Sequence, residues 1–354
     1  MICLIIMLAV MPGASAEKYK KFQAYIYDST DNQVGLIFDT VITLTGYAPD
    51  EETFNASLLL AREKLVYYHR LFDQYNEYPG MNNLCTVNRL AAWEPVRVER
   101  ELFDLLSWCK KQQETYGSRY INIALGSVLR LWHEARENGI NDPEHARLPD
   151  MEALLEASAH TDIESLVLDE ESLTVSFTDP RLSLDLGAVA KGYAAELTRR
   201  ALKEGKMPSF ILNAGGNVCL GQKPLDGRSK WGVGLQNPDD LTGYVDVLYL
   251  TDMNVVTSGD YQRYYTVDGK RYSHLISPQT LMPADDFRSV TVVANDAGFC
   301  DFLSTYLFIA PYETGRALID SLPGVEAYWI LKDGTVHMTD GMRAFARSAG
   351  ADSK

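Results

Sequence analysis

Two patterns of apolar residues alternate along this chain of 354 residues. Short runs rich in β-branched and aromatic residues occupy 22–27 and 34–45, with turn-forming residues at 29–32, and they predict a strand or hairpin. From Asp50 to Phe72, apolar residues instead recur every three or four positions behind an acidic first turn. This spacing predicts an amphipathic helix.

Both patterns continue along the rest of the chain. Helical spacing predicts helices over 99–116, 126–137, 192–205, 299–309 and 313–322, with a further helical stretch near Leu154. Strand patterns fall at 166–168, 173–177, 210–216, 231–236, 245–250, 290–294 and 327–331. Because strands and helices interleave without a strict strand–helix–strand repeat, the predicted fold class is α+β, or mixed α/β.

The first sixteen residues, Met1 to Ala16, carry no charge. An apolar run at 3–10 is followed by the small residues Ala14, Ser15 and Ala16, and this order predicts a secretory signal peptide over 1–16. The run is too short to span a bilayer. We therefore expect an exported protein of the periplasm or the outer face of the cell envelope, with a lipid anchor only if translation begins at another start codon.

The net charge of −15 excludes some partners. Nucleic-acid binding and docking on anionic lipid both depend on basic surfaces, so neither is expected. An acidic protein that handles phosphates needs a metal ion or backbone amides to offset the repulsion. The four cysteines after residue 16 are scattered and predict buried free thiols rather than a zinc site or a disulfide scaffold: Cys85, Cys109, Cys219 and Cys300.

Two glycine-containing segments are candidates for ligand contact. Residues 185–193, with Gly187 and Gly192, lie where a helix begins, and unpaired N–H groups at a helix start can bind phosphate. Residues 213–217 carry Gly215 and Gly216 at the end of a buried strand, where bare backbone lets a ligand approach closely. Taken alone, each segment is explained equally well as a structural turn.

His274 is the histidine in the most suggestive setting. It is one of six in the chain and lies among hydroxyl and aromatic residues at 272–276, not far from the polar segment 257–261. Its side chain suits proton transfer near neutrality. A lone histidine is nevertheless more often a structural residue than a catalyst.

Asp301 and Thr305 form a candidate cation site. They are four residues apart on a predicted helix, so they share one face. Oxygen-only ligands of this kind suit Mg²⁺, which takes its remaining ligands from phosphate and water. The apolar residues Phe299, Leu303 and Leu307 make this a largely buried helix rather than a solvated one.

The order of these segments resembles the ApbE family of FAD:protein FMN transferases. The matching runs are DLGAVAKGY at 185–193, NAGG at 213–216, TSGDY at 257–261, YSHLI at 272–276, and Asp301 with Thr305. Three upstream segments also resemble the family: FDTV at 38–41, NNLCTVN at 82–88 and NIALGSVLRLW at 122–132. The resemblance implies an ApbE-like, T-fold-related single domain over 17–345, with a polar tail at 346–354.

The resemblance also implies a reaction and its site residues. Such enzymes cut the pyrophosphate of FAD, pass FMN to a Ser or Thr hydroxyl of an envelope flavoprotein, and release AMP. Mg²⁺ would be held by Asp301, Thr305 and the backbone carbonyl of Ala188, with Asp301 and His274 as the catalytic residues. His274 would act as the general base or position the phosphate. The implied FAD contacts are Phe38, Asn82, Asn83, Leu84, Asn122, Asp185, Lys191, Asn213, Ala214, Gly215, Gly216, Ser258 and Ile276.

Some positions depart from the family pattern. Asn122 and Ala124 stand where Asp and Thr are usual, and Leu281 stands where glycine is usual, which changes the backbone freedom of that loop. Two other functions therefore remain open beside the transferase. One is an Mg²⁺-dependent FAD pyrophosphatase that yields FMN and AMP, and the other is a non-catalytic FAD-binding envelope protein.

Overall fold

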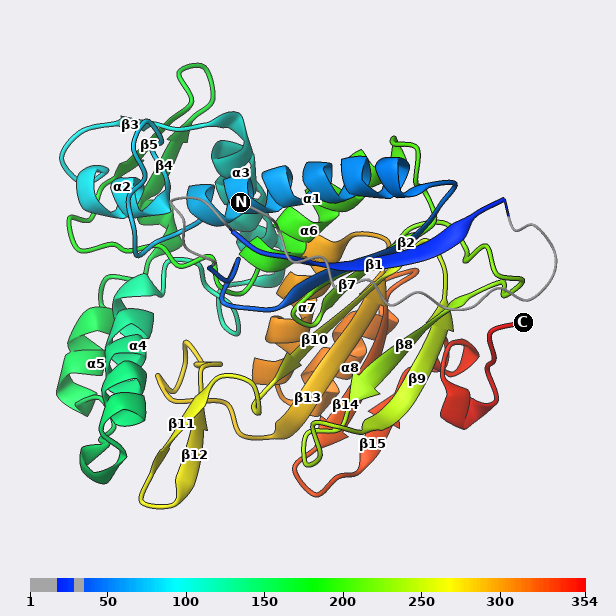
Figure 1. The fold of residues 1–354 in the computed structure, drawn as a ribbon. Helices are drawn as coiled ribbons and strands as arrows, with labels where there is room; N and C mark the ends of the chain where they lie inside the picture. Colours follow the sequence, from blue (N-terminus) through cyan, green and yellow to red (C-terminus); the bar gives the residue numbers. More distant parts are fainter. Residues whose placement is uncertain (1–17, 29–34) are drawn as a thin grey trace.

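An eight-stranded sheet forms the centre of the computed structural model, which describes residues 18–28 and 35–354 (Figure 1). Every pair of neighbouring strands in it is antiparallel. In sheet order the strands are β1 (Lys20–Ile26), β2 (Ile42–Ala48), β6 (Phe210–Ala214), β7 (Asn217–Leu220), β10 (Asn254–Gly259), β13 (Phe287–Ala294), β14 (Glu326–Leu331) and β15 (Val336–Met338). The α+β prediction is confirmed.

Three helices cover one face of this sheet: α1 (Glu51–Leu71), α6 (Ala190–Lys203) and α7 (Ala297–Ile309) (Figure 1). The Asp50 carboxylate starts α1 by accepting a 2.8 Å hydrogen bond from the Thr53 N–H. The apolar stripe of α1 that includes Phe54 and Leu65 is buried against the sheet. α7 is buried along nearly its whole length, so polar side chains on it are held within the protein.

The opposite face carries a two-stranded hairpin of β8 (Trp231–Gln236) and β9 (Tyr244–Leu250). The end of the chain packs beside it, because the Ser348 N–H donates a 3.1 Å hydrogen bond to the Asp246 carboxylate. α8 (Tyr312–Asp320) follows α7 and leads into β14.

Two further groups of elements flank the sheet (Figure 1). The first comprises α2 (Leu84–Leu90), α3 (Arg100–Tyr116), β3 (Val96–Arg97), β4 (Leu166–Asp169) and β5 (Thr174–Phe177), whose apolar side chains join those of α7 in one core. The second comprises α4 (Gly126–Asn141), α5 (Met151–Ser158), β11 (Tyr264–Val267) and β12 (Lys270–Ser273), packed around Trp132.

The structure differs from the sequence predictions in several places. The hairpin predicted from the runs 22–27 and 34–45 is present as the antiparallel pair β1–β2. Its second strand begins only at Ile42, because Phe38 and Asp39 have positive φ angles of 53° and 52° and turn the chain. The strands β7 and β10 and the hairpin β11–β12 were not predicted, since they are short or polar. Residues 84–90, for which no helix was predicted, form α2.

Other predictions concern the cysteines and the signal peptide. Cys109, Cys219 and Cys300 are buried free thiols as predicted, and Cys85 is a half-buried one. The predicted signal peptide over 1–16 and the turn at 29–32 lie outside the described residues. Across 18–28 and 35–354, no helix is long and apolar enough to cross a membrane.

Candidate active site

A cavity of about 610 Å³ lies where the loop before β2, the start of α6, the ends of β7 and β10, and α7 come together. It gathers segments far apart in the sequence. The predicted site residues on its wall are Asn122, Asp185, Ala188, Lys191, Gly215, Ser258, His274, Ile276, Asp301 and Thr305.

Asp301 is fixed in the wall of the cavity by the helix beside it. Asp301 is 4% exposed, and its carboxylate accepts a 2.8 Å hydrogen bond from the Gly192 N–H in the first turn of α6. One helical turn on, the Thr305 hydroxyl lies 3.3 Å from the Ser258 hydroxyl of β10. A carboxylate and a hydroxyl therefore face one cavity from the same side of α7, as their spacing predicted.

The electrostatics of the cavity couple Asp301 to Lys191. Burial raises the pKa of Asp301, and the nearby Lys191 ammonium partly opposes that rise. Burial lowers the pKa of Lys191, with Asp301 as the main opposing charge. Each side chain thus favours the charged form of the other.

His274 projects into the cavity as a neutral imidazole. Its Nδ1 lies 3.2 Å from the carbonyl oxygen of Arg263, and since a carbonyl only accepts, Nδ1 carries the proton and Nε2 is left as an acceptor. Burial, together with the positive charges of Arg263 and Lys191, lowers the pKa of His274 to about 3. The expected value near neutrality is therefore wrong for the ligand-free protein.

The segment 185–188 is ordered by Asp185. One carboxylate oxygen accepts a 2.7 Å hydrogen bond from the Gly187 N–H, and the other accepts one of 2.7 Å from the Gln74 side chain. This turn brings the backbone of Ala188 to the cavity wall just before α6 begins. Asp185 thus shapes the wall as well as lining it.

The turn between β6 and β7 lies against the loop before β2. Gly215 has a φ of 60°, and a Cβ atom there would lie 1.9 Å from the Thr40 hydroxyl. Only glycine fits this close approach. The neighbouring predicted contacts do not line the cavity: Asn213 accepts a 3.3 Å hydrogen bond from the Gly216 N–H, and Ala214 is buried in β6.

Four other predicted FAD contacts lie away from the cavity wall. Asn83 caps α2, accepting a hydrogen bond from the Thr86 N–H, and Leu84 belongs to the hydrophobic core. The Asn82 side chain is exposed and donates to a backbone carbonyl. Phe38 packs on the core, although its carbonyl accepts a 2.8 Å hydrogen bond from Arg263. The amide side chains of Asn82 and Asn83 are thus used in hydrogen bonds within the protein, and the side chains of Leu84 and Phe38 pack in or against its core.

The departures from the family pattern have structural counterparts. The Asn122 side chain makes three hydrogen bonds: its oxygen accepts from Gln113 and from the Ala124 N–H, and its amide donates to the Thr161 carbonyl. Leu281 has a φ of 58°, in the left-handed region that favours glycine. The loop thus keeps a glycine-like conformation with a leucine in it.

Several cavity residues were not predicted. Arg263 and Arg136 bring positive charge to the wall of an acidic protein, and Tyr75 stacks on His133 with ring centroids 4.6 Å apart. A signal existed for Arg263, which follows the TSGDY segment by two residues. The Tyr75–His133 contact joins positions 58 residues apart and left no local pattern.

Comparison with known proteins gives a consistent result. The ApbE family model matches residues 38–329, a range that includes Lys191, His274 and Asp301. An FAD:protein FMN transferase of Klebsiella pneumoniae is 32% identical over 321 residues, covering 89% of this chain and 94% of that protein. One of Treponema pallidum is 34% identical over 274 residues, covering 73% of each chain.

Solved structures agree in fold. The crystal structure of the ApbE protein of Thermotoga maritima superposes with a TM-score of 0.75 at 25% identity, covering 91% of this chain and 99% of that one. The flavin transferase ApbE of Vibrio cholerae has a TM-score of 0.71 at 22% identity, covering 92% and 100%. The fold around the cavity is therefore shared with both.

Proposed function

The chain belongs to the ApbE family, and we propose that it is an FAD:protein FMN transferase, the activity that names its Klebsiella and Treponema relatives. In finer detail, we propose that it moves the FMN part of FAD onto a Ser or Thr hydroxyl of an acceptor flavoprotein, that AMP leaves, and that Mg²⁺ is required. One observation supports this proposal: a single cavity brings together Asp301 and Thr305 of α7, Lys191 of α6 and His274 of the loop after β12, three separate segments of the chain.

Two residues on α7 and one just before α6 fit a magnesium ion. Asp301 supplies a buried carboxylate, Thr305 a hydroxyl, and Ala188 a backbone carbonyl, all oxygen donors. Within 18–28 and 35–354, no three His, Cys, Asp or Glu side chains form a metal cluster, which is consistent with a cation that takes further ligands from phosphate and water. When bound, Mg²⁺ would neutralise pyrophosphate charge and polarise the phosphorus.

Two cationic side chains would hold the pyrophosphate of FAD. Lys191 stands in the first turn of α6, and Arg263 is fixed by its hydrogen bond to the Phe38 carbonyl. Both line the cavity, whose volume of about 610 Å³ suits a large ligand. These charges let a protein of net charge −15 accept an anionic substrate.

His274 would take the proton of the incoming hydroxyl. In the transfer, the acceptor oxygen forms a bond to the phosphorus of the FMN half, the bond from that phosphorus to the bridging oxygen breaks, and AMP leaves with the electron pair. The hydroxyl proton passes to Nε2 of His274, the nitrogen that the Arg263 carbonyl leaves free. The bound pyrophosphate offsets the charges of Arg263 and Lys191, which raises the pKa of His274 for this step.

The place of action is also a proposal. The uncharged segment Met1–Ala16 supports export to the periplasm or the outer face of the envelope, where an acceptor flavoprotein of an electron-transfer system would be modified. Expression of the full chain in a bacterium, followed by fractionation and mass measurement of the mature protein, tests this. A cytoplasmic protein that retains Met1 would contradict export.

The activity is tested by incubating the protein with FAD, MgCl₂ and an acceptor domain that carries the target Ser or Thr. Flavin fluorescence that stays with the acceptor in a denaturing gel, and is absent from a Ser/Thr→Ala acceptor, supports the transferase. Free FMN plus AMP with unlabelled acceptor would instead indicate the pyrophosphatase. Unchanged FAD would indicate a binding protein.

A further inference from the structure

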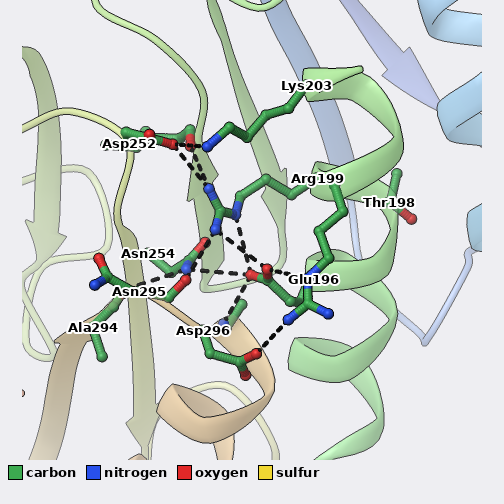
Figure 2. Close-up of polar contacts among 12 residues, drawn as sticks. Glu196, Thr198, Arg199, Lys203, Asp252, Asn254, Ala294, Asn295 and Asp296 are labelled. Carbon is green, nitrogen blue, oxygen red and sulfur yellow. Dashed lines mark hydrogen bonds and ion pairs between the residues drawn. The ribbon is translucent and has the colours of Figure 1, made fainter. Parts of the chain in front are cut away.

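Glu196 is a buried acid in the second turn of α6 whose partners lie on several elements (Figure 2). It is 3% exposed and forms ion pairs with Arg199, at 3.1 Å, and Arg200, at 2.8 Å. A carboxylate buried this deeply is stable only where several groups pair with its charge or donate hydrogen bonds to it. The site described above does not include it.

Glu196 also holds the beginning of α7. Its Oε2 accepts a 3.1 Å hydrogen bond from the Ala297 N–H, the first residue of that helix. A carboxylate is favoured there because the first N–H groups of a helix lack partners within it. Asp301, the proposed metal ligand, lies one turn further along α7.

Two hydrogen bonds therefore connect α6 and α7, one turn apart. On α6, Gly192 and Glu196 are four residues apart, and on α7, Ala297 and Asp301 are four residues apart. The Gly192 N–H donates to Asp301, and Glu196 accepts from Ala297. Between them the helices touch, since a Cβ atom on Gly192 would lie 2.3 Å from the Ala297 carbonyl oxygen and 2.4 Å from Asp301 Cβ. The position of α7 along α6 thus sets the position of the Asp301 carboxylate.

Arg199 stabilises this contact between α6 and α7. Its guanidinium is buried, bonds both oxygens of Glu196 and donates a 2.9 Å hydrogen bond to the carbonyl of Asn295, in the turn before α7 (Figure 2). On its other side it pairs with Asp252 at 3.1 Å. Asp252 also pairs with Lys203 at 2.5 Å, and these two contacts lie on the side away from α7.

We propose that the Glu196–Arg199 pair is a positioning device for the magnesium centre, which fixes the start of α7 on α6 and so the place of Asp301. This inference rests on the proposed function. It assigns a role in metal binding to Glu196 and Arg199, neither of which lines the cavity.

The test is Glu196→Asp, which keeps the buried charge opposite Arg199 but withdraws the carboxylate from Ala297 by one methylene. The half-saturating MgCl₂ concentration is measured from the Mg²⁺-dependent rise in Tm and from calorimetry, without turnover. We expect it to increase about tenfold, the effect typical of residues that orient a metal ligand. FAD affinity without Mg²⁺ should stay within twofold of the wild type.

Asp252→Asn is the matched control, because it removes a charge from Arg199 without touching α7. It should lower Tm and leave the half-saturating MgCl₂ concentration unchanged. Arg199→Lys serves as a second variant should Glu196→Asp fail to fold, with the same expected weakening. A folded Glu196→Asp protein with wild-type Mg²⁺ affinity, or equal weakening in Asp252→Asn, would overturn the inference alone. Absence of any Mg²⁺ effect in the wild type would overturn the proposed metal centre and the inference with it.

Discussion

The indole N–H of Trp132, on α4, donates a 2.8 Å hydrogen bond to the carbonyl of Leu281, 149 residues further along the chain. Leu281 is 5% exposed and holds its left-handed backbone against α4. Trp132 also stacks on Tyr272, with ring centroids 6.4 Å apart. This contact joins two cavity walls, one from α4 and one from the loop after β12.

Trp132→Phe should weaken that junction. The substitution leaves the buried Leu281 carbonyl without its donor, which costs about 1–3 kcal/mol of unfolding free energy. The KM for FAD should rise, because the loop lines the cavity. Urea denaturation and steady-state kinetics measure the two effects. Trp93→Phe, at a side chain 78% exposed, is the control and should change stability by less than about 0.5 kcal/mol. Equal effects of both variants would contradict this role for Trp132.

Asp301→Asn should separate folding from metal binding. The asparagine oxygen can still accept from Gly192, and since burial raises the pKa of Asp301, the folded protein disfavours this charge and the variant should still fold without metal. Transfer should fall at least about 100-fold, because a bound cation supplies several kcal/mol. The Mg²⁺-dependent rise in Tm should disappear. Asp320→Asn, at an exposed position at the end of α8, is the control. A folded Asp301→Asn enzyme with wild-type turnover would refute the metal assignment.

The sequence predicted best what depends on local spacing. Asp301 and Thr305 were placed on one face of a buried helix because four-residue spacing and the apolar residues around them are local properties. α1 was predicted from its apolar stripe and acidic first turn for the same reason. The order of the strands in the antiparallel sheet was not predicted, since which strands become neighbours depends on the whole chain.

The failures come from hydrogen bonds that the sequence pattern does not reveal, some between nearby residues and some between distant ones. Asn83 was predicted as an FAD contact, yet its amide donates to the carbonyls of Arg70 and Asn76 and its oxygen caps α2. The Gly192–Asp301 hydrogen bond spans 109 positions, and nothing local to either residue indicates it. The family resemblance predicted the order of the site segments along the chain, and the structure shows how these segments lie relative to one another in space.

Asp39 should oppose substrate binding. Its carboxylate lies 3.6 Å from the Arg263 guanidinium at the cavity and would repel the FAD phosphates. Asp39→Asn should therefore tighten FAD binding severalfold at low salt and less at high salt, because salt screens the repulsion. Asp340→Asn, at a side chain 95% exposed, is the control for net charge. Titration of FAD fluorescence measures the affinity, and weaker binding by Asp39→Asn would contradict the repulsion.

Asp39→Gly tests the backbone at the same position. Asp39 has a φ of 52°, where a non-glycine residue costs about 1–2 kcal/mol. Glycine should therefore raise the unfolding free energy by about 1 kcal/mol relative to Asp39→Asn, which keeps a side chain there. Both variants lack the charge, so the difference between them reflects the backbone strain and the loss of the asparagine side chain. A glycine variant less stable than the asparagine variant would mean that the side chain contributes more than the strain.

His274 should give the enzyme an unusual dependence on pH. Its pKa of about 3 in the free protein keeps it neutral above about pH 4, so kcat/KM should show no acid limb near 6.5 from this residue. Bound FAD offsets the charges of Arg263 and Lys191, so the acid limb of kcat should lie at higher pH than that of kcat/KM. Profiles measured with the acceptor domain test this order. The reverse order, or an acid limb of kcat/KM near 6.5 that Lys191→Gln leaves unmoved, would contradict the proposed coupling.

The lowered pKa of His274 also makes the unfolding free energy depend on pH. Between about pH 6.5 and 3 the unfolded chain binds the His274 proton and the folded protein does not, so the unfolding free energy falls as the pH falls through this range. His274→Gln removes that contribution and should flatten the acid side of the stability profile. His145→Gln, at a side chain 71% exposed, should leave the profile unchanged. Equilibrium urea unfolding at pH 4.5, 5.5 and 7 compares the three proteins, and parallel profiles for all of them would show that His274 is not kept neutral by its surroundings.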